Sequence, residues 1–287
     1  LLLSVYIGYL VCCTIYDFYL RFIGGKSTST FVKFSIYTNA LRVLDTEVRR
    51  ENIPAIQGIR FFSMCWVILG HTYFKQTLGV VANGADVITW MKSWTSLYVL
   101  IAPFTVDTFF VIGGFLTSYL FMKEMAKGTK FNIFMYYLHR YLRLTPALAV
   151  LLLLTIFIFP KIGSGALWEL NMKEQEITCK SNWWPMLLYV QNYVNTDNIM
   201  CLGHLWYLAV DMQLFWISPI ILCPLAWKPK IGLSISGALL IASIIVPAVI
   251  SVQHKYSGAL FTTLDIDEVI DFMIKFYMVT YTRCGAW

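Results

Sequence analysis

Two ionisable residues stand near the ends of one apolar stretch, IRFFSMCWVILGHT: Arg60 close to its start and His71 close to its end. In a helix the two side chains would share one face, because eleven residues make three turns with about 20° of drift. They would lie about 16 Å apart along the axis. Ionisable residues in a membrane usually face a bundle interior and mark a site. A second interpretation stays open, in which Arg60 extends to the headgroups and His71 is a structural residue at the opposite interface.

Polar side chains also interrupt two other apolar stretches. Asp107 lies in FTVDTFFVIGGFLTSYL, and His204 and Asp211 lie in CLGHLWYLAVDMQLFW. His204 and Asp211 are seven residues apart, nearly two helical turns, so they share a helix face. Each aspartate alone is explained equally well by a structural ion pair, for example between Asp211 and Arg60. Two histidines, two aspartates and one arginine on three predicted helices are less easily explained as structural residues alone.

The stretch YYLHRYLRLTP carries Arg140 and Arg143 at positions i and i+3, at the predicted cytosolic end of a helix. Their guanidinium groups would form one cationic face at the membrane surface. A positive-inside anchor is the simple explanation for such a pair. The more specific interpretation is a docking site for phosphate groups, because the guanidinium fork matches phosphate oxygens.

The elements that would position these residues are membrane helices. Hydrophobic residues make up 58% of the chain, against about 45–50% in soluble domains. Charged residues make up 13%, against about 25%. We therefore predict an all-α, polytopic helical integral membrane protein. The basic residues behind the net charge of +6 follow the predicted membrane topology, so nucleic acid is not an expected partner.

Apolar segments predict about six to seven transmembrane helices. The first is interpreted as a retained helix, because no small-residue cleavage site follows it. The last, near 268–281, is weaker because it contains Asp271 and Lys275. We expect the natural protein to continue beyond both ends of this sequence. The six stronger candidates are 1–20, 55–75, 97–121, 143–160, 204–223 and 231–251.

Three loops are rich in Lys and Arg, and three others are poor in them. The rich loops are 21–53, 122–142 and the turn after 223, and the poor loops are 76–96, 161–203 and 252–267. By the positive-inside rule the rich loops are cytosolic, and the charges of 21–53 are most simply a solvated face. Cys179 and Cys201 flank a polar loop of the other set and could pair if it faces an oxidising compartment.

We expect no bound metal, because the four histidines are scattered without ligand spacing. The sequence also lacks a Gly-rich phosphate loop, since GG at 24–25 and 113–114 is too short. The ionisable residues above are therefore the candidates for any chemistry.

Four segments together resemble the acyltransferase-3 family of membrane proteins and, in its animal branch, the nose-resistant-to-fluoxetine proteins. RFFSMCWVILGH is similar to the family's Arg-x10-His element, at Arg60 and His71. VDTFFVIGGFL is similar to its aspartate-bearing helix, and RYLR to its Arg-x-x-Arg element. CLGHLWYLAVDMQLF is similar to its WYL-x-x-D-M-Q helix, with Cys201 paired to an upstream cysteine, here Cys179. TIYDFY and YTRCG extend the similarity towards both ends.

This resemblance implies a bundle of about ten membrane helices, of which the chain would be a truncated part. Residues 1–20 would be the first transmembrane helix, 21–53 a cytosolic linker, and 54–287 a C-terminally incomplete acyltransferase-3-like domain. The implied activity is acyl transfer at a plasma membrane or endomembrane. Acyl-CoA would be the donor, with no bound cofactor. Membrane lipids would surround the protein, and a hydroxyl group of a lipid, sugar or protein would be the acceptor.

The resemblance also implies catalytic roles. His71 would take the proton of the acceptor hydroxyl. Arg60 would bind donor phosphates or the developing negative charge. Either Asp211 or Asp107 would orient His71, and the sequence does not choose between them.

Arg140 and Arg143 would bind the CoA phosphates. His204 would also bind substrate. One departure from the family pattern concerns Gly113-Gly114-Phe115, where the family often has Ser-Gly-Phe. This difference removes a hydroxyl that we expect beside Asp107.

Two other functions stay open. Buried charges in a helical bundle serve transport equally well, so a lipid or small-molecule transporter is the first alternative. A catalytically inactive, receptor-like member of the family is the second. Covalent transfer of a labelled acyl group would separate the enzyme from both.

Overall fold

The computed structural model describes residues 2–24, 29–47, 53–77, 79, 82–196, 201–256 and 265–287. Within these ranges the chain folds into helices and turns, without a β-strand. It divides into two compact units, Leu1–Ala55 and Ile56–Trp287. Arg49 and Arg50, which contribute to the predicted basic linker, lie outside the described residues.

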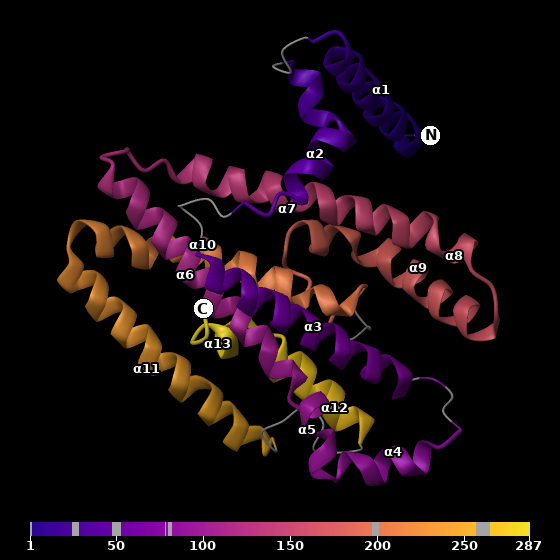
Figure 1. Cartoon of the computed structure of the whole chain (residues 1–287). Coiled ribbons are helices and arrows are strands. Elements are labelled where there is room, and N and C mark those ends of the chain that lie inside the picture. The colour runs from indigo at the N-terminus through magenta and orange to yellow at the C-terminus, as the bar shows by residue number, and fades with distance from the viewer. Residues whose placement is uncertain are drawn as a thin grey trace. The chain divides into compact units, whose positions relative to one another are not determined.

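The first unit contains α1 (Leu2–Phe22), the 3₁₀-helix η1 (Thr30–Phe34) and α2 (Ile36–Val43). α1 forms where the first apolar segment predicts a helix. Ser35 ends η1 and caps α2, since its side chain accepts a hydrogen bond from the Thr38 amide at 3.2 Å. Both η1 and α2 pack along α1 (Figure 1).

The second unit is a bundle of long helices joined by short helical turns (Figure 1). Its long helices are α3 (Pro54–Thr77), α6 (Thr105–Ala126), α7 (Ile133–Phe157), α9 (Ala166–Leu187), α10 (Trp206–Trp227) and α11 (Pro229–His254). Its short elements are α4 (Gly84–Met91), η2 (Trp94–Ser96), α5 (Leu97–Leu100), η3 (Ala102–Phe104), α8 (Phe159–Ile162), η4 (Gly203–Leu205), α12 (Ile266–Phe272), the π-helical turn η5 (Met273–Tyr277) and α13 (Thr280–Arg283).

Helix α10 is the centre of this unit. It packs against α6 and α11, and half of its residues are buried, including Asp211 and Gln213. A helix that is apolar all round belongs inside a bundle or a membrane. By contrast, α11 buries only Gly232 and Ser243 and leaves the rest of its apolar surface open. Buried polar side chains, which a functional site needs, therefore occur on α10.

Four helical segments are long and apolar enough to cross a membrane, by length and composition. They are Trp94–Ala126, Ile133–Phe157, Gly203–Trp227 and Pro229–His254. They confirm the prediction of an all-α polytopic membrane protein. α3 forms a helix over the predicted segment 55–75, and its crossing of the membrane, like that of α1, stays a prediction.

Three predicted boundaries were wrong. α7 begins at Ile133 instead of 143, so the predicted loop 122–142 shrinks to 127–132. Residues 133–142 are helical, and the helix continues through Pro146. An internal proline removes one backbone hydrogen bond but does not necessarily end a helix. The stretch 268–281 is not one helix: it is divided among α12, η5 and α13, with Val279 extended.

The polar loop predicted at 161–203 contains a helix of 22 residues, α9, which lies along α7. A search for apolar spans missed it, because α9 carries several charged side chains. One of its buried residues is Cys179, which forms a disulfide with Cys201 across 22 positions of sequence. The predicted pairing is confirmed, and it attaches α9 to the turn that precedes α10.

Gly114 allows the backbone of Trp287 to contact α6 directly. An ideal Cβ at Gly114 would lie 1.8 Å from the Trp287 carbonyl oxygen. Gly113 faces Asp211 and the Trp287 indole, so the hydroxyl expected beside Asp107 would lie beside Asp211 instead. This placement corrects the expectation drawn from Gly113-Gly114-Phe115.

Gly114→Ala is therefore expected to destabilise the protein by about 1–3 kcal/mol, the usual cost of overpacking. Gly8→Ala is the matched control, because a Cβ there meets nothing within 4 Å and alanine favours a helix. Thermal unfolding in detergent micelles would compare the two. Equal melting temperatures would contradict the tight approach at Gly114.

Candidate functional site

His71 and His204 face each other from two segments that are far apart in sequence. Their rings form an edge-to-face pair with centroids 6.4 Å apart. Nδ1 of His71 lies 2.9 Å from the Val67 carbonyl oxygen, one turn earlier in α3. A carbonyl oxygen can only accept a hydrogen bond, so Nδ1 carries the proton and Nε2 of neutral His71 is free to accept one. Both histidines are exposed.

The two imidazole rings lie close enough together to reach one small substrate group. A hydrogen bond of about 2.8 Å to a ring nitrogen places the oxygen about 4 Å from the ring centroid. Centroids 6.4 Å apart are therefore close enough for a single hydroxyl to contact both rings. The arrangement is suited to holding a hydroxyl group and removing its proton.

Contacts with the segment before α6 hold His71 in place. Trp66 Nε1 donates to the Tyr98 carbonyl oxygen at 2.5 Å, and the Tyr98 hydroxyl donates to that of Tyr73 at 3.1 Å. Gly70, the residue before His71, lies against Ala102, since a Cβ there would be 2.5 Å from the Ala102 Cβ. These contacts fix the end of α3 that carries the histidine.

His204 is held by the tight turn η4. Cys201 ties this turn to α9 through the disulfide. Leu202 has a φ of 48°, which is unusual for a residue with a side chain, and its amide donates to Gln175 Oε1 at 3.2 Å. Gln191 Nε2 donates to the Leu205 carbonyl oxygen at 3.1 Å. The turn is thus fixed on both sides of the histidine.

Asp211 forms an ion pair with Arg140 of α7. The pair is largely buried, with 19% of the Arg140 side chain and 11% of the Asp211 side chain exposed. The Arg140 guanidinium also lies over the Phe215 ring, 4.2 Å from its centroid. His71 hydrogen-bonds to the Val67 backbone, and Asp211 pairs with Arg140. Among the described residues, no hydrogen bond joins His71 to an aspartate.

Arg60 is half-buried, and its charge acts on Tyr207, as do those of Asp211 and Arg140. His71 is near the end of α3 and meets the start of α10, so the two helices run in opposite directions (Figure 1). The structure thus brings His71 to His204 and gathers the charges of Arg60, Asp211 and Arg140 around Tyr207, whereas Asp107 pairs elsewhere, with Arg283.

The comparison with known families decides what kind of protein carries this arrangement. Residues 53–268 match the family described as an acyltransferase domain, Acyl_transf_3. The chain belongs to the acyltransferase-3 family. The match runs from the start of α3 into α12 and includes both histidines and the Arg140–Asp211 pair.

Three relatives illustrate the likeness. Nose resistant to fluoxetine protein 6 of Caenorhabditis elegans is 31% identical over 269 residues, covering 88% of this chain and 32% of the relative. Regulator of hypoxia-inducible factor 1 of C. elegans is 25% identical over 210 residues, covering 70% and 40%. O-acetyltransferase OatA of Staphylococcus aureus (strain NCTC 8325 / PS 47) is 28% identical over 215 residues, covering 72% and 30%. The chain thus spans about a third of these relatives' length, and no solved structure matches it.

In this acyltransferase-3 protein, Asp107 is bound by an arginine that sequence reasoning did not select. Arg283 donates from one nitrogen to both Asp107 carboxylate oxygens at 3.1 Å. Its guanidinium lies over Tyr277, 4.3 Å from the ring centroid, and its Nε donates to the Tyr277 carbonyl oxygen at 2.9 Å. The available signal was YTRCG, the segment that contains Arg283 and extends the family resemblance towards the C-terminal side. Asp107 therefore helps to fix the last segment against α6.

Arg143 is exposed and, among the described residues, forms no ion pair. Arg140 instead turns inward to Asp211. The single cationic face predicted from RYLR is thus divided in two, because a neighbouring helix supplies a carboxylate to only one of the arginines.

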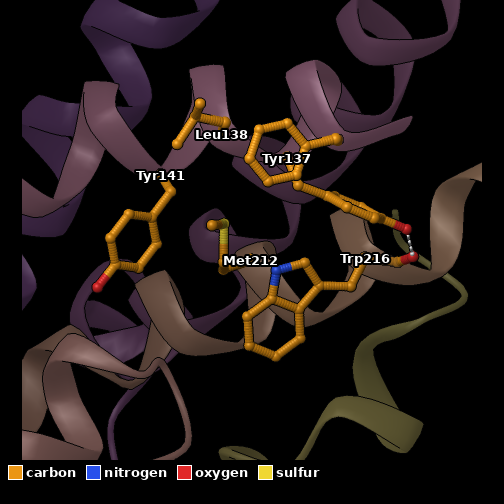
Figure 2. Close-up of a pocket in the computed structure, with 6 residues that line it drawn as sticks. Tyr137, Leu138, Tyr141, Met212 and Trp216 are labelled. Carbon is orange, nitrogen blue, oxygen red and sulfur yellow. Dashed lines mark hydrogen bonds between the residues drawn. The ribbon is translucent and has the colours of Figure 1, made fainter. Parts of the chain in front are cut away.

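An apolar hollow of about 220 Å³ lies between α7 and α10. Figure 2 shows Tyr137, Leu138 and Tyr141 of α7 above Met212 and Trp216 of α10, with the Tyr137 hydroxyl donating to the Trp216 carbonyl oxygen at 2.8 Å. A lining without charges suits a hydrocarbon chain.

Proposed function

We propose that the chain forms the catalytic membrane region of an O-acyltransferase, which moves an acyl group from acyl-CoA to a hydroxyl acceptor. The observation that carries this proposal is the edge-to-face pair of histidines, 6.4 Å apart between centroids, in a member of the acyltransferase-3 family. The name of the bacterial relative, O-acetyltransferase OatA, supports transfer to oxygen. That name specifies no donor, so the CoA thioester is a proposal from the chemistry.

In the proposed reaction, Nε2 of His71 removes the proton from the acceptor hydroxyl as its oxygen attacks the acyl carbonyl carbon. His204 holds the same oxygen from the other side. The tetrahedral intermediate then collapses, the carbon–sulfur bond breaks, and the leaving thiolate takes the proton from His71. Arg60 stabilises the negative charge that develops on the acyl oxygen or binds the donor phosphates.

The two arginines of α7, Arg140 and Arg143, have different proposed roles. Arg140 is already neutralised by Asp211, so we propose that this pair shapes the bundle beside the reaction site. The exposed Arg143 is the better candidate for the CoA phosphates, since its guanidinium is not used in an ion pair among the described residues. The basic residues of the loop before α7 favour the cytosolic side for the start of that helix, where acyl-CoA is available, and Arg143 follows about 15 Å further along it.

The direct test offers labelled acyl-CoA to the full-length protein in lipid vesicles. The expected result is label in a covalent product that hydroxylamine releases, as it does from an oxygen ester. Recovery of unchanged acyl-CoA, with label moved across the vesicle membrane, would contradict the proposal and favour transport. Acetyl-CoA and palmitoyl-CoA would be compared, because the sequence and the site leave the chain length open.

A further inference from the structure

The segment that follows α1 is described over residues 29–47 and folds against that helix. It turns back and lies against α1 along much of its length. Ring contacts pair Phe31 with Tyr16 at 6.1 Å and Phe34 with Tyr9 at 5.5 Å between centroids. Tyr9 stands thirteen residues before Phe22, which is about 20 Å along the helix. α2 then returns towards the end of α1, where Tyr37 contacts Phe18 at 4.7 Å.

A buried carboxylate fixes the hairpin to α1. Asp17 has no exposed surface. It accepts hydrogen bonds from the hydroxyls of Ser35, at 2.7 Å, and Thr38, and from Nε of Arg21 at 3.0 Å. The same arginine donates to the Thr38 hydroxyl at 3.0 Å. Since a buried charge is costly without such partners, this network holds the apex of the hairpin in one position.

The backbone polar groups at the turn are satisfied by protein. The Ile36 amide donates to the Thr14 hydroxyl oxygen at 3.0 Å, and the Ser35 amide to the Val32 carbonyl oxygen at 3.1 Å. Asn39 Nδ2 donates to the carbonyl oxygens of Lys33 and Ser35, both at 2.9 Å. Thr14 lies eight residues, or about 12 Å, from the end of α1. Irregular backbone is tolerated at membrane depth where it is buried in protein, and Ser35, at the turn, has no exposed surface.

The outer surface of the hairpin is apolar. Between 37% and 53% of the surface of five side chains is exposed: Phe31, Phe34, Ile36, Tyr37 and Leu41. α1 exposes similar side chains over the same length, including Val5, Ile7, Val11 and Ile15. α1 is itself an apolar segment long enough for a bilayer.

We propose that residues 29–44 form a re-entrant hairpin whose outer face contacts the lipid acyl chains of the leaflet at the C-terminal end of α1. Arg42, in the last turn of α2, extends to the phosphate headgroups, as long basic side chains do at a membrane surface. This placement replaces the solvated cytosolic face that the charges of 21–53 predict. It is independent of the proposed acyl transfer.

Photo-labelling of the unmodified protein in lipid nanodiscs tests the proposal. A phospholipid with a diazirine in its acyl chain is irradiated, and adducts on tryptic peptides are counted by mass spectrometry. Peptide 34–42 is expected to carry adducts about as often as the peptide from α11. It should carry at least several times more than the α9 peptide 174–180. Hydroxyl-radical oxidation of Phe34 and Tyr37 should be correspondingly low.

Oxidation of this peptide without lipid adducts would overturn the proposal in favour of a solvated linker. Protection from both reagents would overturn it in favour of a surface covered by protein. A variant adds a second readout: Thr14→Val removes the acceptor of the Ile36 amide, whereas Thr72→Val removes a bond made only within its own helix. Thr14→Val should lower adducts on peptide 34–42 at least twofold and Thr72→Val should not. Equal values would contradict docking on α1.

Discussion

Replacing His71 with alanine is expected to reduce acyl transfer by a factor of about 10²–10⁴, the usual contribution of a general base. The reason is that Nδ1 is committed to the Val67 carbonyl oxygen, which leaves Nε2 as the group that can accept the acceptor's proton. The measurement is the initial rate of labelled ester formation by the full-length protein in vesicles, at equal amounts of folded protein.

His139→Ala is the matched control for that experiment. His139 is exposed on α7 and is absent from the histidine pair, so its loss should leave the rate unchanged. A His71→Ala protein that folds and transfers acyl groups at near the wild-type rate would remove His71 from the mechanism. A loss of folded protein in His71→Ala but not in His139→Ala would instead assign His71 a structural role.

Removing Asp211 is expected to destabilise the protein by about 3–5 kcal/mol, because Asp211→Ala leaves the buried Arg140 charge without its partner. The double variant Arg140→Leu with Asp211→Leu should recover much of that loss, since apolar side chains carry no desolvation cost. Denaturant unfolding in detergent micelles would measure the free energy of unfolding for each variant.

Glu176→Ala is the control for the ion pair. Glu176 pairs with Lys180 on the exposed surface of α9, where hydrogen bonding from Lys180 lowers the pKa of the glutamate. Exposed pairs of this kind contribute little to stability, so the unfolding midpoint should barely move. If Asp211→Ala were as mild as this control, the buried pair would not support the bundle.

Local sequence patterns predicted the helices well where they were apolar and poorly where they were not. The segments at 204–223 and 231–251 became α10 and α11 with small changes in their ends. α9 was missed because charged side chains alternate with apolar ones along it. Its stability comes from packing on α7 and from the Cys179–Cys201 disulfide. An apolar-span search detects burial in lipid, and it does not detect a helix that packs on one face and meets water on another.

The sequence by itself determined that this protein is a helical membrane member of the acyltransferase-3 family, with Arg60 and His71 on one helix. It also determined which cysteines could pair. Only the tertiary structure decided the partners: His204 for His71, Arg140 for Asp211, and Arg283 for Asp107. The last two pairs are separated by 71 and 176 residues. Helical periodicity fixes the face and height of a side chain on its own helix, but the partner depends on how distant helices pack.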